Sequence, residues 1–144
     1  RPTRAALPQM YRRGGGSIVI VGSVNAYYPD PGIYDYCATK AAVTNFAKAL
    51  SKELGPKNIR VNSISPGPVT TPLWLDEGGV ADTIAGASGQ TAEEVRAATA
   101  GAAPTGRFTT PDEVANLVVF LASDRSANIT GSDLRIDGGL ITTI

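Results

Sequence analysis

Histidine is absent from this sequence of 144 residues, and cysteine occurs once, as Cys37. Without histidine, the chain alone cannot form a Ser-His-Asp hydrolase site, a Cys-His protease site or a histidine-ligated zinc site. A single cysteine excludes an internal disulfide and a metal-binding cysteine cluster, and it suits a reducing compartment. We therefore expect no metal site and a cytoplasmic location.

An excess of charge of either sign is also absent. Lysine and arginine total 13, as do aspartate and glutamate, so the formal net charge is zero. A general nucleic-acid or anionic-membrane binder needs excess positive charge, so we expect neither partner. No apolar run approaches the length of a membrane span, and no secretory signal opens the sequence. With 42% hydrophobic residues, the composition is that of one compact globular domain.

Strand and helix patterns alternate in the first half of the sequence. Residues 17–21 form an apolar, β-branched run that favours a central strand of a parallel sheet. Residues 34–54 have helical periodicity, and residues 59–65 are typical of a second strand. This order predicts the right-handed crossover of an α/β fold. The remaining predictions here are a helix tail over 1–13 ended by Gly14-Gly15-Gly16, a loop over 22–33, and an apolar helix face made of Val43, Phe46, Ala47, Leu50 and Leu54.

The second half of the sequence predicts helices before one last strand. Pro66-Gly67-Pro68 ends the second strand, and residues 72–106 show no strand pattern. We predict a helical lid over 72–106, because loops this long in compact domains are usually functional; solvated surface helices are the alternative. Further predictions are capping boxes at Thr91 with Glu94 and at Thr110 with Glu113, an apolar helix after the second box, and a strand over 133–136 before Asp137-Gly138-Gly139.

Three residues of the first half could carry chemistry. Tyr36 and Lys40 are four residues apart on the predicted helix and therefore share a face. A lysine cation near a phenol lowers the tyrosine pKa from its reference of about 10, which would make Tyr36 a general acid/base. Ser23 follows the first strand, at the edge where open α/β sheets bind ligands, and its hydroxyl could hold a substrate oxygen. The alternatives are a surface contact between Tyr36 and Lys40 and a turn serine that bonds its own backbone.

These residues lie within a set of four motifs. The run Tyr36-Cys37-Ala38-Thr39-Lys40-Ala41-Ala42-Val43, thirteen residues after Ser23, resembles the active-site pattern of the short-chain dehydrogenase/reductase family. Three further segments resemble other parts of that family, in the expected order and spacing. They are Arg60-Val61-Asn62-Ser63-Ile64-Ser65-Pro66-Gly67-Pro68-Val69-Thr70-Thr71-Pro72, Gly106-Arg107 with Pro111-Asp112-Glu113-Val114-Ala115, and Asn128-Ile129-Thr130-Gly131 followed by Asp137-Gly138-Gly139.

The resemblance implies a fold and an activity. The fold would be the C-terminal part of a doubly wound, parallel-sheet Rossmann-type α/β domain over residues 1–144, with the helical substrate lid at 72–106. The activity would be that of an oxidoreductase that transfers hydride between NAD or NADP and a secondary alcohol or ketone. Tyr36 would be the acid/base, Lys40 would bind the nicotinamide ribose and lower the pKa of Tyr36, and Ser23 would orient the substrate carbonyl. Many members of the family are dimers or tetramers, so a homo-oligomer is expected.

The same resemblance implies the other site residues. Besides Tyr36 and Lys40, the cofactor would be bound by residues that line the nicotinamide, with the backbone of Val69 reaching its carboxamide: Pro66, Gly67, Val69 and Thr71. The residues expected to shape the substrate pocket are Val24, Asn25, Tyr28 and Trp74. We expect Asp137-Gly138-Gly139 to be structural and Cys37 to be a packed helix residue.

The family's glycine-rich phosphate-binding turn has no counterpart in the sequence. No G-x-G-x-x-G occurs, and Gly14-Gly15-Gly16 precedes a strand, whereas a phosphate site needs a strand before it and a helix after it. We therefore expect a chain that derives from a longer dehydrogenase, lacks the N-terminal dinucleotide-binding half, and is inactive in isolation. In such a chain, strand 17–21 would lose a neighbouring strand and leave an open sheet edge that is prone to association. The alternative function is a non-catalytic scaffold or oligomerisation fragment that binds no cofactor. A hydrolase based on Ser23 is a distant third, because no histidine base exists.

Overall fold

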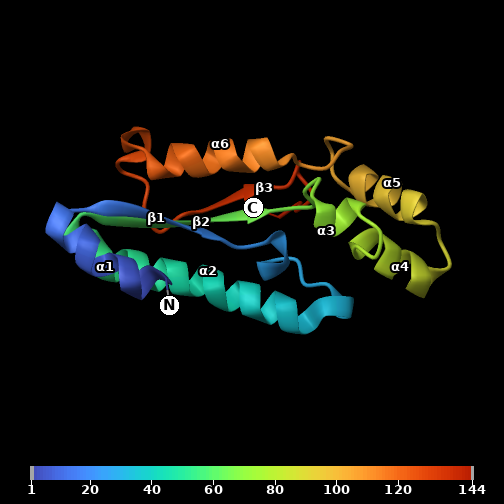
Figure 1. The fold of residues 1–144 in the computed structure, drawn as a ribbon, viewed down its shortest axis with the longest axis horizontal. Helices are drawn as coiled ribbons and strands as arrows, with labels where there is room; N and C mark the ends of the chain where they lie inside the picture. Colours follow the sequence, from blue (N-terminus) through green and yellow to red (C-terminus); the bar gives the residue numbers. More distant parts are fainter. Residues whose placement is uncertain (1, 144) are drawn as a thin grey trace. The chain divides into compact units, whose positions relative to one another are not determined.

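Three strands form one sheet in the computed structural model, which describes residues 2–143 (Figure 1). β1 and β2 are parallel, in a register that runs from Gly16 opposite Ile59 to Val21 opposite Ile64. Helix α2 connects these two strands, so the predicted strand–helix–strand unit is confirmed. The strand order is β1-β2-β3, with bounds Gly16–Val21, Ile59–Pro66 and Asp133–Ile136, and α2 spans Tyr34–Leu54.

The chain divides into two compact units. The first comprises Arg1–Ser65 with Asn116–Arg135, and the second comprises Pro66–Ala115 with Ile136–Ile144. Arg1, which begins the predicted helix tail, and Ile144 lie outside the described residues. No helix within residues 2–143 is long and apolar enough to cross a membrane. The other helices are α1 (Pro2–Arg13), α3 (Pro72–Leu75), α4 (Val80–Ser88), α5 (Ala92–Ala102) and α6 (Pro111–Ala122), and the 3-10 turns are η1 (Val24–Ala26), η2 (Pro31–Ile33), η3 (Gly55–Lys57) and η4 (Asp124–Ser126).

β1 occupies one end of the sheet order. Its apolar run predicts a central strand, but β2 is the only strand that pairs with it among residues 2–143. Gly16 and Val21 are exposed, and the four residues between them are only partly buried. Within the described residues, β1 therefore lies at an open edge of the sheet, as we expect for this strand where a neighbouring strand is missing.

The first unit has its apolar core on one side of β1 and β2. Figure 1 shows α1 and α2 on the same side of these strands. Side chains from both helices and both strands meet there, and complete burial of one Leu or Ile contributes about 1.5–3 kcal/mol. The buried members are Ala47, Leu50, Leu54, Ile59 and Val61, with Leu7, Met10, Ile18 and Ile20 packed against them.

Phe46 does not belong to this core, although the sequence places it on the apolar face of α2. Its side chain is 51% exposed, whereas that of Ala47 is 2% exposed. The helix buries Ala47, Leu50 and Leu54, whose spacing places them on one face. The prediction for Phe46 is therefore wrong, because the stripe that α2 buries is narrower than the apolar stripe of its sequence.

Two capping boxes begin helices in the second half of the chain, as predicted. The Thr91 hydroxyl accepts from the Glu94 N–H at 3.2 Å, and Glu94 accepts from the Thr91 N–H at 2.8 Å. Thr110 and Glu113 make the same reciprocal bonds at 3.2 and 2.8 Å. Residues 72–106 contain helices and no strand, which confirms that part of the prediction.

Arg107 reinforces the second capping box. Its guanidinium donates to both carboxylate oxygens of Glu113, at 2.6 and 2.9 Å. This hydrogen bonding, followed by that from the Thr110 backbone, lowers the pKa of Glu113 from its ordinary value of 4.5 to about 2. A carboxylate whose pKa is lowered by folding contributes its full stabilisation at pH values above its pKa in the unfolded chain. That contribution is lost as the pH falls through its lower pKa in the folded chain.

The Glu113→Gln substitution tests this linkage. We expect the variant to unfold at a lower urea concentration than the parent at pH 7. The difference should shrink as the pH falls from about 4.5 towards 2, because the parent's carboxylate is then protonated. Urea unfolding curves at a series of pH values measure the effect, and a difference that stays constant down to pH 3 contradicts it.

Candidate functional site

Ser23 lies just beyond the carboxyl end of β1, where it begins the turn η1. Its hydroxyl accepts from the N–H of Asn25 at 3.2 Å and donates to the Asn25 side-chain oxygen at 3.2 Å. The residue is 7% exposed. Ser23 thus makes the backbone turn contact that the sequence left as an alternative, and this contact holds its hydroxyl at the carboxyl end of the strand.

Tyr36 and Lys40 lie near the beginning of α2, in the same unit as Ser23. The Lys40 ammonium donates to the backbone oxygen of Val21 at 3.2 Å and is 5.5 Å from the centre of the Tyr36 ring. Val21 is the last residue of β1, so this bond ties the beginning of α2 to the carboxyl end of the strand. Helix α2 also packs against η1, which Ser23 begins. The structure therefore places all three predicted catalytic residues at one end of β1.

The residues expected to shape the substrate pocket have different surroundings. Val24 is 5% exposed and therefore packs inside the first unit. The Asn25 amide donates to the backbone oxygen of Tyr28 at 3.1 Å and so braces the loop after Ser23. Tyr28 is exposed. Of these three side chains, Tyr28 is the one that is exposed and could contact a ligand.

The predicted nicotinamide-lining residues lie in the second unit, at the last residue of β2 and in the segment that follows it. Pro66, Gly67, Val69 and Thr71 are all partly buried. Val69 forms an isolated parallel bridge with Thr109, and its backbone oxygen accepts from the Thr71 N–H at 2.8 Å. These bonds hold the backbone of the segment in a defined turn.

Trp74, the remaining predicted pocket residue, belongs to α3 in the second unit. Its ring meets that of Phe108 edge to face, with 5.3 Å between the ring centres and an interplanar angle of 67°. Aromatic pairs prefer this geometry. Trp74 is therefore anchored by a neighbouring aromatic ring, and the start of the predicted lid has a fixed packing partner.

Asp137 closes the turn that follows β3. Its carboxylate accepts from the N–H groups of Gly139 and Ile141, each at 3.0 Å. The backbone N–H of Gly67 donates to Ile136 at 3.0 Å, so the two segments of the second unit run close together. A Cβ atom at Gly67 would lie 3.0 Å from both Cα and Cβ of Asp137. Asp137 and its glycines therefore act structurally, as expected, and a side chain at residue 67 would press against Asp137.

The sequence does not predict the polar cluster around Asp133 in the first unit. Its carboxylate accepts hydrogen bonds from Ser63 and Ser65, two buried residues of β2. Burial raises the pKa of Tyr27, and the negative charge of Asp133 raises it further. The one available signal was Asp133 itself, an acidic residue within a short strand.

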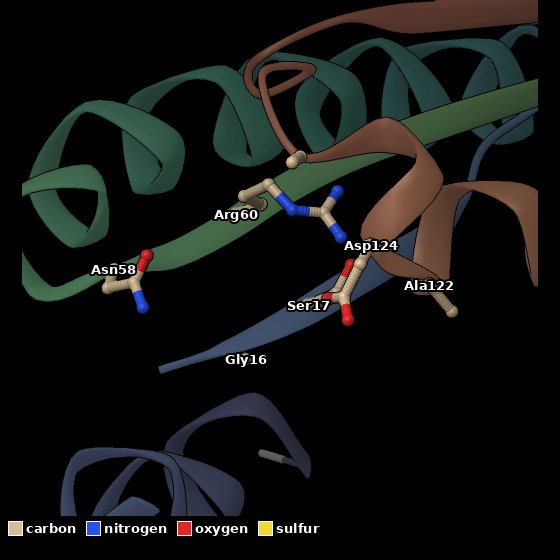
Figure 2. A pocket seen from close by; sticks show the side chains of 7 residues that line it. Gly16, Ser17, Asn58, Arg60, Ala122 and Asp124 are labelled. Atoms are coloured by element: carbon tan, nitrogen blue, oxygen red, sulfur yellow. The ribbon is translucent and has the colours of Figure 1, made fainter. Parts of the chain in front are cut away.

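A pocket of about 190 Å³ lies at the amino-terminal end of β1 and β2, away from Ser23 (Figure 2). The guanidinium of Arg60 lies against it and donates to the backbone oxygens of Leu121 and Ser123, at 2.9 and 3.0 Å. These oxygens are at the end of α6, where a cation is favourable. Arg60 thus holds a helix end, and the pocket has no part in the candidate site. The lining residues are Gly16, Ser17, Asn58, Arg60, Ala122, Asp124 and Ala127.

The α/β fold, with Ser, Tyr and Lys at the carboxyl end of a parallel strand, is typical of one class of proteins. Comparisons with known proteins identify that class. The sequence model of a family described as Enoyl-(Acyl carrier protein) reductase matches residues 1–141. The 3-oxoacyl-(acyl-carrier-protein) reductase FabG of Thermotoga maritima is 39% identical over 139 residues, covering 96% of this chain and 51% of that protein. Human dehydrogenase/reductase SDR family member 4 is 36% identical, covering 95% of this chain and 45% of that protein.

A solved structure agrees with these relatives. The L-sorbose reductase of Gluconobacter frateurii, in complex with NADPH and L-sorbose, is 37% identical with a TM-score of 0.86. The match covers 99% of this chain and 53% of that one. The chain belongs to the short-chain dehydrogenase/reductase family, and its expected Rossmann-type α/β fold is confirmed. It spans about half the length of the curated relatives it matches.

The Gly67→Ala substitution tests the close contact with Asp137. We expect a loss of about 1–3 kcal/mol in the free energy of unfolding, because overpacking against backbone atoms forces a shift of the chain. Urea denaturation measures it. The matched control is Gly86→Ala in α4, where an added Cβ meets no atom within 4 Å; that change should stabilise by up to about 1 kcal/mol. Equal stability of Gly67→Ala and the parent contradicts the assignment.

Proposed function

We propose that the protein containing this chain is an NAD- or NADP-dependent oxidoreductase that interconverts a secondary alcohol and the corresponding ketone. The observation that carries the proposal is the grouping of Tyr36, Lys40 and Ser23 at the carboxyl end of β1. Open α/β sheets bind their ligands at this end of the strands. The names of the similar proteins, reductases and dehydrogenases, support the same reaction class.

The donor set fits a nicotinamide cofactor. The Lys40 ammonium has three N–H donors, of which the backbone oxygen of Val21 takes one, so donors remain for the two ribose hydroxyls. Tyr36 is 42% exposed, which leaves its phenol accessible to the same group. We propose Tyr36 and Lys40 as ribose-binding residues, and the segment that carries Pro66, Gly67, Val69 and Thr71 as the nicotinamide-binding wall. When bound, the cofactor supplies or accepts the hydride.

The chain's own residues would handle the proton. Tyr36 gives its phenolic proton to the substrate oxygen during ketone reduction and takes it back during alcohol oxidation. The Lys40 ammonium, 5.5 Å from the centre of the Tyr36 ring, attracts the negative charge that forms on the phenolic oxygen. Ser23 orients the substrate oxygen by turning its hydroxyl from the Asn25 side chain to that oxygen.

Substrate access and assembly are further parts of the proposal. We propose residues 72–106, with Trp74 at their start, as a lid over a small-molecule alcohol or ketone. We propose Val24, Asn25 and Tyr28 as further residues that shape the substrate pocket. The family resemblance supports a homodimer or homotetramer, and Cys37, which is buried and unpaired, suits the reducing conditions of the cytoplasm.

A second function, a non-catalytic scaffold that binds no cofactor, is favoured by one observation. The sequence carries no G-x-G-x-x-G phosphate-binding motif. Such a scaffold would keep the fold and the surfaces for assembly. Cofactor binding distinguishes the two functions, because the scaffold would bind neither NADH nor NADPH.

The Tyr36→Phe substitution tests the acid/base. In the natural protein that carries this chain, we expect kcat to fall by about 10²- to 10⁴-fold, the usual contribution of a positioned proton donor, with no change in Tm. Tyr34→Phe is the matched control, because Tyr34 lies on the same helix and is 77% exposed. Steady-state kinetics and thermal unfolding give both readouts. Turnover retained by Tyr36→Phe overturns the assignment.

Cofactor binding gives a second test, independent of turnover. Fluorescence titration of the natural protein with NADH and with NADPH should saturate for at least one of them. Lys40→Met should raise the Kd by about 10- to 100-fold, because a hydrogen bond from a charged group contributes about 1.5–3 kcal/mol. Lys52→Met, an exposed lysine of the same helix, should leave the Kd unchanged. No saturation with either cofactor would favour the scaffold.

A further inference from the structure

The side chain of Asn25 is hydrogen-bonded at both ends of its amide. The amide oxygen, Oδ1, accepts from the Ser23 hydroxyl at 3.2 Å, and the amide nitrogen, Nδ2, donates to the backbone oxygen of Tyr28 at 3.1 Å. Ser23 begins the turn η1, Asn25 is its middle residue, and Tyr28 lies just beyond it. Asn25 therefore connects the hydroxyl that is proposed to orient the substrate with the backbone of the loop that follows it.

The contact with Tyr28 decides which way the Asn25 amide faces. The oxygen of an asparagine amide only accepts hydrogen bonds, and its nitrogen only donates them. A backbone oxygen cannot donate, so the Tyr28 oxygen requires the nitrogen of the amide. The amide oxygen is thereby turned towards Ser23, and the Ser23 hydroxyl must be the donor in the bond between them.

The Ser23 hydroxyl is held by Asn25 through two separate bonds. A serine hydroxyl can donate one hydrogen bond and accept two. The side-chain oxygen of Asn25 takes the hydroxyl proton, and the backbone N–H of Asn25 donates to the hydroxyl oxygen at 3.2 Å. The same residue thus fixes the place of the hydroxyl oxygen and the direction of its proton.

The backbone that carries the Tyr28 oxygen is itself held in place. The N–H of Ala26 donates to the backbone oxygen of Ser23 at 3.0 Å. The N–H groups of Tyr27 and Tyr28 both donate to the backbone oxygen of Val24, each at 2.9 Å. Ser23 and Val24 are buried, so these bonds are protected from water. The Tyr28 oxygen is therefore a fixed point to which the amide is attached.

We infer that Asn25 is a positioning residue for Ser23: its amide, held by the backbone oxygen of Tyr28, sets the place and direction from which the Ser23 hydroxyl meets the substrate oxygen. The inference rests on the proposed function, in which Ser23 orients the substrate. It gives Asn25 a role beyond shaping the pocket, and that role depends on the hydrogen bonds of the amide rather than on its size.

Two substitutions in the natural protein test the inference. Asn25→Ala and Asn25→Leu both remove the hydrogen bonds of the amide, but alanine leaves space whereas leucine is close to asparagine in size. Each should lower kcat by about 10- to 100-fold, because a displaced orienting group costs on that scale. The Kd for the cofactor should not change, because Lys40 and Tyr36 are untouched. Parent-level kcat in either variant overturns the inference.

Asn58 offers a matched control in the same unit. Its side-chain amide also donates to a backbone oxygen, that of Gly14 at 3.0 Å. It lines the pocket at the amino-terminal end of β1 and β2, away from Ser23 (Figure 2). Asn58→Ala should lower Tm, because alanine disfavours the φ of 57° at this position, and should leave kcat unchanged. A fall in kcat as large as that of Asn25→Ala shows that general loosening explains both, and overturns the inference.

A double substitution separates positioning from direct contact with the substrate. In a Ser23→Ala background, Asn25→Leu should have no further effect on kcat, because the hydroxyl that Asn25 positions is already absent. Single-turnover kinetics measure the slow rates of this background. A further loss shows that Asn25 acts other than through Ser23, and so overturns the inference.

Hydrogen exchange of side-chain amides examines the contact without turnover. In ¹⁵N-labelled protein, the amide signals of Asn25 are those lost in Asn25→Leu. They should exchange with solvent more slowly than those of Asn128, which is exposed, because the Tyr28 oxygen accepts from the Asn25 amide. Equal exchange rates show that the amide is not held, and overturn the inference.

The outcomes also distinguish this inference from the proposed function. If Ser23→Ala retains full turnover, the role proposed for Ser23 is wrong and the inference falls with it. If Ser23→Ala loses turnover while Asn25→Ala and Asn25→Leu retain it, the proposed function stands and the inference alone is wrong.

Discussion

The burial of β2 is the constraint on which the first unit depends. Every residue from Val61 to Ser65 is buried, and three of these five are polar. A buried polar group without a partner costs about 1–3 kcal/mol, so each of these side chains requires a specific neighbour. Asn62 donates to Ile129 at 2.8 Å and accepts from the Ser132 N–H at 3.1 Å. The segment after α6 is therefore held against β2 by directed hydrogen bonds as well as by packing.

Strand β2 is apolar where it begins and polar where it approaches the candidate site. Its first residues contribute to the apolar core that holds α2 against the sheet. The hydrophobic effect responsible for this packing is not directional. Its later residues, Ser63 and Ser65, hold the carboxylate of Asp133 by hydrogen bonds from their hydroxyls. Because α2 is fixed by the core at its other end, Tyr36 and Lys40 are carried to the carboxyl end of β1. The residues of the candidate site thus lie outside the apolar core, but the core fixes the helix and the strand that carry them.

Local signals were sufficient to predict most of the elements. Strand 59–65, helix 34–54 and the capping boxes at Thr91 and Thr110 depend on residues within a few positions of one another, and the structure has them within about one residue of the prediction. The exposure of Phe46 escaped prediction, because it depends on which distant surfaces are present to cover that side chain. The spacing of apolar residues predicts which face of a helix they share. It does not predict whether another part of the protein covers that face.

The sequence by itself determined the class of the protein: the absence of histidine, the spacing of Ser23, Tyr36 and Lys40, and the motifs that follow them are properties of the chain in one dimension. Only the tertiary structure decided that Lys40 bonds to the end of β1, that a side chain at residue 67 would press against Asp137, and that Asp133 accepts from Ser63 and Ser65. The physical reason is distance along the chain. Asp133 and Ser63 are 70 residues apart, and no local pattern in the sequence predicts a contact that forms only in the folded chain.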